Sequence, residues 1–117
     1  MKTYLPVAPG THRSFSHTRP VYVVDSLTQL GGPSSGIVHL PITLDWTPAS
    51  SYDLSSASRL RSMYATVLRE AGSEADLIEW LDCRLLLQHW SELNLPAFTR
   101  SSWESKHPEL RGRASWR

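Results

Sequence analysis

Histidine and cysteine are the side chains in this sequence best suited to nucleophilic or metal chemistry, but their spacing favours neither. His89, in RLLLQHWSELNLP, lies six positions after Cys83, the single cysteine. Six residues place two side chains on very different sides of a straight helix, so the pair could meet only if the helix bent. His89 also has no second His or Cys three or four positions away, a spacing common among zinc ligands. We therefore predict no catalytic residue, no metal site and no cofactor, and a protein that is not an enzyme.

Aromatic and acidic side chains are better suited to contact another protein. The sequence has five Trp residues, a residue type enriched at protein interfaces because its ring buries a large area. Five acids and no base fall between positions 70 and 82, although a solvated helix face would also explain them. We expect some Trp residues in the core and one or two at the surface. The candidate partner-binding residues are Trp80, His89, Trp90, Trp103, Glu74, Asp76 and Glu79.

DNA binding through the C-terminal basic residues is the alternative hypothesis. In a helix-turn-helix arrangement, residues 96–105 would form the recognition helix, and basic side chains would contact bases and phosphates. A formal net charge of +1 and the acidic segment before this helix argue against it. The candidate nucleic-acid-binding residues are Arg100, Lys106, Arg111 and Arg113.

Length and composition indicate one small globular domain. The chain has 117 residues, of which 40% are hydrophobic and 20% charged, as in ordinary globular proteins. A single cysteine excludes an intrachain disulfide, and no segment approaches the ~18 apolar residues of a membrane span. The N-terminal residues lack the apolar run of a signal peptide. We expect a cytoplasmic protein.

The first half of the sequence has the pattern of a β-hairpin. Residues 21–30 are rich in β-branched and aromatic side chains, and residues 37–46 alternate between apolar and polar. The segment GGPSSG between them is typical of a turn, and it lacks the spacing and the lysine of a phosphate-binding loop. Pro41 cannot donate a hydrogen bond to a neighbouring strand, which favours an edge strand.

The second half predicts short helices. One apolar helix face is formed by Leu60, Met63, Tyr64, Val67, Leu68 and Ala71. Candidate N-caps precede this helix at Asp53, Ser55 and Ser56, and Gly72 is a plausible stop. A second helix would begin after Ser73 with an approximate capping box, bend or break at Asp82-Cys83 and continue to about residue 93. A third would span residues 96–105, because proline fits the first turn of a helix.

The predicted fold class is therefore α+β. An N-terminal β-hairpin with edge-type strands is followed by a bundle of three or four short helices. Residues 20–110 would form the single domain, with an irregular arm at 1–19 and a flexible basic tail at 111–117.

Residues 20–110 also resemble a group of small uncharacterised proteins from high-GC Gram-positive bacteria. The resemblance rests on Gly36, Trp46, Tyr52-Asp53-Leu54, Tyr64, Val67-Leu68-Arg69-Glu70, Leu85-Leu86, Trp90, Leu95-Pro96, Arg100, Trp103-Glu104 and Pro108-Glu109-Leu110. Members of this group are often encoded beside nucleotidyltransferase-like toxins of the abortive-infection type. The resemblance implies a protein-binding module, an antitoxin-like partner that holds such a toxin inactive.

Overall fold

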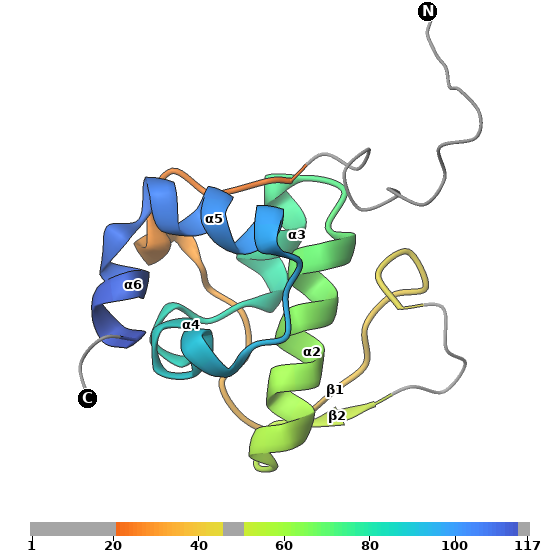
Figure 1. The fold of residues 1–117 in the computed structure, drawn as a ribbon. Coiled ribbons are helices and arrows are strands. Elements are labelled where there is room, and N and C mark those ends of the chain that lie inside the picture. Colours follow the sequence, from red (N-terminus) through yellow and green to blue (C-terminus); the bar gives the residue numbers. More distant parts are fainter. Residues whose placement is uncertain (1–20, 46–50, 115–117) are drawn as a thin grey trace, which may run out of the picture.

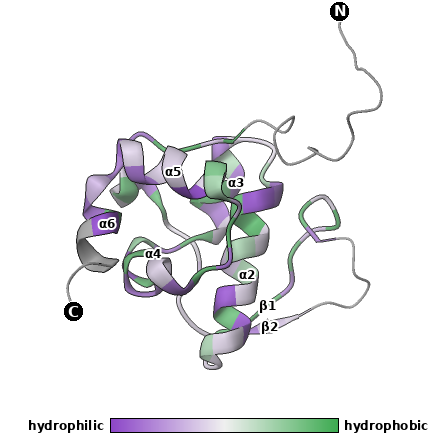
Figure 2. Ribbon diagram, viewed as in Figure 1, coloured by the Kyte–Doolittle hydropathy of each residue, from purple (hydrophilic) through white to green (hydrophobic). Residues whose placement is uncertain are grey.

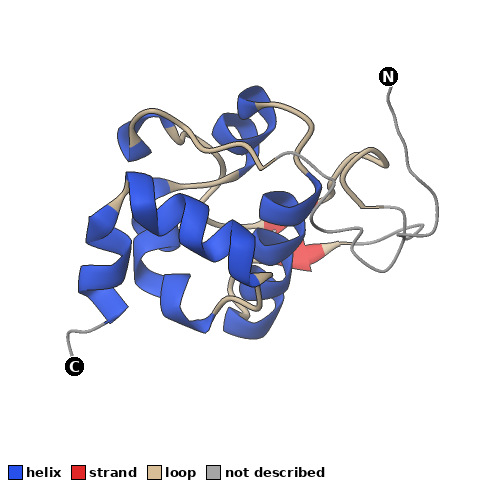
Figure 3. Ribbon diagram, turned by 45° about the horizontal axis from the view of Figure 1, so that its top comes forward, coloured by secondary structure: helices blue, strands red, loops and turns tan. Residues whose placement is uncertain are grey.

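The computed structural model describes residues 21–45 and 51–114 and shows a small α+β fold (Figure 1). A two-stranded antiparallel sheet is followed by short helices, which confirms the predicted fold class (Figure 3). The predicted arm at 1–19 lies outside the described residues, as does Trp46. The elements are η2 (Leu27–Gln29), β1 (Ile37–Val38), β2 (Tyr52–Asp53), α2 (Ala57–Glu70), α3 (Glu74–Trp80), α4 (Cys83–His89), η3 (Trp90–Glu92), α5 (Ala97–Lys106) and α6 (Pro108–Ala114).

Only the second of the two predicted strands forms, and only in its first residues. Strand β1 covers only two residues and pairs with β2, which follows the predicted hairpin in the chain. The predicted strand at 21–30 is wrong, because this segment contains the 3-10 helix η2. Ser26 and Gln29 form a reciprocal capping box there, in which the Ser26 N–H donates to the Gln29 side chain at 3.0 Å. These local bonds satisfy the backbone without a partner strand.

The predicted strand at 37–46 is shorter than its alternating pattern indicated. After Val38 the chain turns, because the Pro41 carbonyl accepts hydrogen bonds from the backbone N–H groups of Leu44 and Asp45. The turn removes Ile42 from the apolar face, and this side chain is 72% exposed, whereas Leu44 is buried. A proline within an alternating run thus marks the end of the strand here.

Gly31 and Gly32 of GGPSSG bond to the last part of α3 and to Leu81 after it, and they do not form the predicted hairpin turn. The Gly31 N–H donates to the Ile78 carbonyl at 3.0 Å, and the Gly32 N–H donates to the Leu81 carbonyl at 2.8 Å. A Cβ atom on Gly32 would lie 2.4 Å from the carbonyl carbon of Trp80, closer than any side chain permits. Glycine is therefore required at position 32 because two backbones meet there.

Helix α2 forms as its sequence predicts. Ser56 is the N-cap, and its hydroxyl accepts a hydrogen bond from the Arg59 N–H at 3.3 Å. Hydrophobic and hydrophilic stretches alternate along the helix (Figure 2), as expected where only one face meets the core. The predicted apolar positions are all buried, namely Leu60, Met63, Tyr64, Val67, Leu68 and Ala71.

Helices α3 and α4 are separated at the predicted break. Leu81 is extended, and the Asp82 carboxylate caps α4 by accepting a hydrogen bond from the Leu85 N–H at 3.1 Å. The Asp82 N–H in turn donates to the hydroxyl of Tyr64 at 2.8 Å. Helix α2 therefore holds the joint between the next two helices through one hydroxyl group.

The start of α3 differs from the predicted capping box. Ser73 occupies the N-cap position, but its side chain makes no capping bond. The Asp76 carboxylate instead accepts a hydrogen bond from the Gly72 N–H at 2.9 Å. The acid still satisfies a backbone donor beside the helix N-terminus, one residue earlier than the motif predicts.

The C-terminal helices pack around two indole rings. Helix α5 begins directly after Pro96, as predicted, and the ring of Trp103 lies 6.1 Å from that of Trp90, measured between centroids. His107 follows α5 and is buried, and its Nε2 atom donates to the Val24 carbonyl at 2.8 Å. This bond joins the end of α5 to the chain before η2.

The predicted flexible tail at 111–117 is helical in its first part, because α6 extends to Ala114. Pro108 lies in the first turn of α6, where its missing N–H has little cost, and Glu109 suits the positive end of the helix dipole. Leu110 is fully buried and fixes α6 against the core. No helix within residues 21–45 and 51–114 is both long and apolar enough to cross a membrane.

Candidate interaction site

The predicted partner-binding Trp residues are mostly core residues. Trp90 and Trp103 are both fully buried, so neither ring can contact a partner in this conformation. The Trp90 indole N–H donates to the Glu104 carboxylate at 2.8 Å. Trp80 is partly buried and packs against the core, which leaves part of this ring at the surface. Trp90 and Trp103 confirm the expectation of core Trp residues, and Trp80, the partly exposed one of these three, stays a candidate for partner contact.

The acidic candidates divide into two structural classes. Glu74 and Glu79 are exposed on α3 and project into solvent. Asp76 is partly buried and accepts the hydrogen bond from Gly72, so it stabilises the helix start. The exposed carboxylates of α3 are thus the two that a partner can reach without disturbing the fold.

Arg100, a candidate residue of the DNA-binding hypothesis, is partly buried and is held by contacts within the protein. Its guanidinium donates to the carbonyl of Trp90 at 3.2 Å and to the carbonyl of Leu93. It also lies 3.8 Å from the Glu104 carboxylate and 5.2 Å from the centroid of the Trp90 ring. The Leu93 carbonyl thereby gains a donor, and the Trp90 carbonyl, which already accepts the Leu93 N–H, gains a second one, so Arg100 has a structural role. These contacts occupy much of its guanidinium, and its contact with nucleic acid stays a prediction.

The other basic candidates form no joint surface with Arg100. Lys106 pairs with Asp25 at 2.8 Å, and this ion pair holds the pKa of the Asp25 carboxyl below its usual value. Arg111 is exposed on α6, and the side chain of Arg113 lies outside the described part of the chain. One exposed guanidinium and one paired ammonium do not form the basic stripe expected of a DNA-binding helix.

His89 and Cys83 do not form a pair. Cys83 is the first residue of α4 and His89 is the last, and the helix is unbroken between them. Six residues of α-helix separate them by about 9 Å along the axis. Burial raises the pKa of the Cys83 thiol, and the charge of Asp82 raises it further, which disfavours the reactive thiolate. Among the described residues, no three His, Cys, Asp or Glu side chains gather where a metal ion could bind.

An open, concave surface lies along one side of α2. This open groove, which we call the α2 groove, has a volume of about 470 Å³. One wall comes from α2, where helical spacing brings residues three or four apart onto one face. The opposite wall comes from η3 and the loop after it, through Glu92 and Asn94. The α2 residues that line the groove are Ser58, Arg61, Ser62, Ala65, Thr66 and Arg69.

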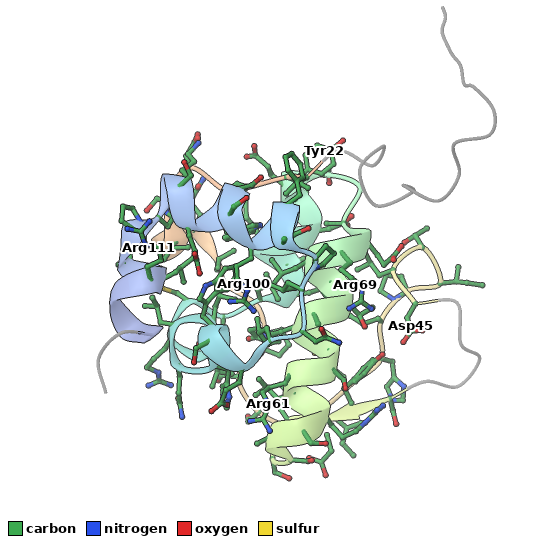
Figure 4. All side chains as sticks on the ribbon, in the orientation of Figure 1. Tyr22, Asp45, Arg61, Arg69, Arg100 and Arg111 are labelled. Atoms are coloured by element: carbon green, nitrogen blue, oxygen red, sulfur yellow. The ribbon has the colours of Figure 1, made fainter. Side chains whose placement is uncertain are left out.

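Arg61 and Arg69, both labelled in Figure 4, line the α2 groove and differ in their contacts. The Arg61 guanidinium donates to the Glu92 carboxylate at 2.9 Å. Arg69 is exposed and makes no hydrogen bond or ion pair with the residues that the structure describes. The groove therefore has one neutralised guanidinium, one unpaired guanidinium and a local positive charge.

His89 lies close to the ion pair of Arg61 and Glu92. Its Nδ1 atom is buried without a hydrogen-bond partner among the described residues and lies 3.8 Å from the Glu92 oxygen that binds Arg61. This separation is too long for a hydrogen bond. His89, a candidate partner-binding residue, therefore lies next to the wall of the groove, and most of its side chain is buried.

The groove residues could not be recognised from the sequence. Arg61 and Arg69 fall on the polar side of an amphipathic helix, a pattern that a plain solvated face also produces. Their opposite wall comes from a segment 31 residues away in the chain, measured from Arg61 to Glu92. Comparison with protein-family models, curated proteins and solved structures finds no match to this chain.

Proposed function

We propose that this protein is a non-enzymatic protein-binding module that contacts its partner through the α2 groove. The observation that carries the proposal is the guanidinium of Arg69, which has no partner among residues 21–45 and 51–114, within a concave, polar surface. Arginine is enriched at binding surfaces because its fork of N–H groups can hold a carboxylate with two bonds. An exposed arginine beside further donors is a suitable anchor for such a contact.

The lining of the groove favours binding over catalysis. Its hydroxyl groups come from Ser58, Ser62 and Thr66, and a hydroxyl nucleophile requires a base within hydrogen-bond reach. Glu92 is the one carboxylate of the lining, and it is paired with Arg61. Neutral donors beside charged ones recognise a ligand without needing to transfer a proton.

The resemblance to proteins encoded beside nucleotidyltransferase-like toxins supports an antitoxin-like role. In this proposal, the α2 groove binds the toxin while the exposed carboxylates of α3, Glu74 and Glu79, face its basic substrate cleft. Charge complementarity of this kind increases the association rate and suppresses wrong partners. The toxin would be held inactive because its substrate site is covered.

Co-expression with the product of the neighbouring gene tests the proposal. We expect the two proteins to purify together and co-expression to relieve toxicity. Arg69→Glu reverses the charge of the groove and should abolish both effects. Arg84→Glu is the matched control, because Arg84 is exposed on α4 and does not line the groove. Separate migration of the two wild-type proteins, with no relief of toxicity, would show that the proposal is wrong.

A further inference from the structure

We infer that the α2 groove binds an extended, acidic peptide segment of another protein, with two carboxylates four residues apart. The inference rests on the proposed function and specifies the chemistry of the partner at that same site. The relevant observations are the spacing of the two arginines, the donors between them and the distribution of acids in this chain.

The spacing of Arg61 and Arg69 sets the length of the ligand. The two residues are eight positions apart on one face of α2, which corresponds to about 12 Å along the helix axis. In an extended peptide, side chains at i and i+4 point to the same side and lie about 13 Å apart. Two acids at this spacing match the two helix positions, whereas a single carboxylate or phosphate is much shorter than the distance between them.

The groove between the arginines suits a peptide backbone. Ser62 and Thr66 provide hydroxyl groups there, and Asn94 adds an amide from the opposite wall. An extended segment has unpaired carbonyl and N–H groups that need partners when they leave water. Ala65 forms a small, buried floor between the hydroxyls, which leaves room for the chain to approach.

This chain cannot supply the acidic segment from the parts that the structure does not describe. Its 11 acids all lie within residues 21–45 and 51–114, so the sequences of 1–20, 46–50 and 115–117 contain neither Asp nor Glu. The N-terminal 20 residues carry basic side chains instead, which the arginines would repel. These segments therefore do not supply the acids, and the inference places them on another protein.

The carboxylate of Glu92 favours a peptide over a nucleic-acid strand as the ligand of the groove. Its carboxylate lies on the groove wall beside Arg61. A nucleic acid has a negative charge at every unit and would bring some of these charges near Glu92. A peptide with neutral residues between its two acids avoids this repulsion. The ion pair of Arg61 and Glu92 is partly exposed, so exchange of Glu92 for a ligand carboxylate has a small cost.

Fluorescence anisotropy with labelled peptides tests the inference on the full chain. One peptide carries two Glu residues at i and i+4 in a Ser/Thr host, and the other carries the same residues with the two Glu adjacent. We expect the spaced peptide to bind more tightly and its affinity to fall as salt rises. Arg69→Gln should weaken the spaced peptide about tenfold, which corresponds to one charge-assisted contact, and Arg84→Gln should leave it unchanged.

Glu92→Gln provides a variant with the opposite expected effect. It removes the carboxylate that competes for Arg61, so the spaced peptide should bind more tightly than to the wild type. A general loss of structure could not produce a gain in affinity. Equal affinity for the two peptides would overturn the inference, as would tighter binding of a single-stranded oligonucleotide than of the spaced peptide. A wild-type dimer that Arg69→Gln dissociates would also overturn it, by showing that a second copy occupies the groove.

The peptide assay tests the ligand chemistry, and the co-expression experiment tests the partner, so each hypothesis can be refuted without the other. Co-purification that depends on Arg69, without any preference for the spaced peptide, would refute the ligand chemistry and leave the partner proposal standing. Preference for the spaced peptide without co-purification would refute the toxin partner and leave the ligand chemistry standing.

Discussion

Replacement of Gly32 by alanine tests whether two backbones really meet at the joint between α3 and α4. The added Cβ would lie 2.4 Å from the Trp80 carbonyl carbon and 2.6 Å from the Leu81 nitrogen. Carbon atoms in favourable contact are about 3.5–4.0 Å apart, so the two segments must separate by about 1 Å or more. Both neighbours are backbone atoms, so no side-chain rotation can relieve the contact.

The expected loss of stability follows from what this separation breaks. It would stretch the bonds from the Gly31 N–H to Ile78 and from the Gly32 N–H to Leu81, which measure 3.0 and 2.8 Å. Each such bond contributes about 1 kcal/mol, and overpacking alone costs about 1–3 kcal/mol. We expect Gly32→Ala to lower the free energy of unfolding by about 3–5 kcal/mol if both bonds are lost. That is a large part of the about 5–15 kcal/mol typical of a domain.

Gly31→Ala is the matched control, because it changes the neighbouring residue in the same way. The nearest atom to its Cβ would be the Gln29 carbonyl oxygen at 3.9 Å, which is ordinary contact. We expect its free energy of unfolding to lie within about 0.5 kcal/mol of the wild type. Urea titrations followed by fluorescence of the buried Trp90 and Trp103 measure both variants. If Gly32→Ala is as stable as Gly31→Ala, the close approach of the backbones is refuted.

Three further predictions concern polar contacts that hold the helices together. Tyr64→Phe removes the acceptor of a backbone N–H and should lower the free energy of unfolding by about 1–3 kcal/mol, whereas Tyr22→Phe should change it little in the same urea titration. Arg100→Ala removes the bonds to the Leu93 and Trp90 carbonyls, of which Trp90 keeps its bond from the Leu93 N–H, and should lower the unfolding midpoint; an unchanged midpoint would contradict its structural role. The hydrogen bond and charge of Lys106 lower the pKa of Asp25 in the folded state. The pair therefore stabilises the protein fully at pH values above the pKa of Asp25 in the unfolded chain. This stabilisation is lost as the pH falls through the pKa of Asp25 in the folded state. The difference in urea midpoint between wild type and Lys106→Met should therefore shrink from about pH 6 to about pH 3, and a constant difference would contradict the assignment.

Helical segments could be predicted from the sequence because their signals are local. The apolar spacing of residues 57–70, the Ser56 cap and the Gly72 stop all lie within one short stretch, and α2 forms there. Pro96 marks the start of α5 in the same way. These signals act through bonds and contacts between residues at most four positions apart, so they operate whatever the rest of the chain does.

The strands and the tail could be predicted less well, because competing signals are close in energy. Residues 21–30 have the composition of a strand, yet the capping box of Ser26 and Gln29 produces η2 there. A strand needs a partner with a matching edge, and composition does not reveal whether one is present. The segment at 111–114 has the charge of a solvated tail, but the burial of Leu110 just before it holds α6 in place.

The sequence by itself determined the α+β class and where the helices begin and break, because helix periodicity and capping are properties of neighbouring residues. Only the tertiary structure decided which side chains face a partner. It buried Trp90 and Trp103, turned Arg100 toward backbone carbonyls and brought Glu92 next to Arg61 across 31 residues. These outcomes depend on contacts between distant segments, and local patterns carry no information about which segment will cover a given face.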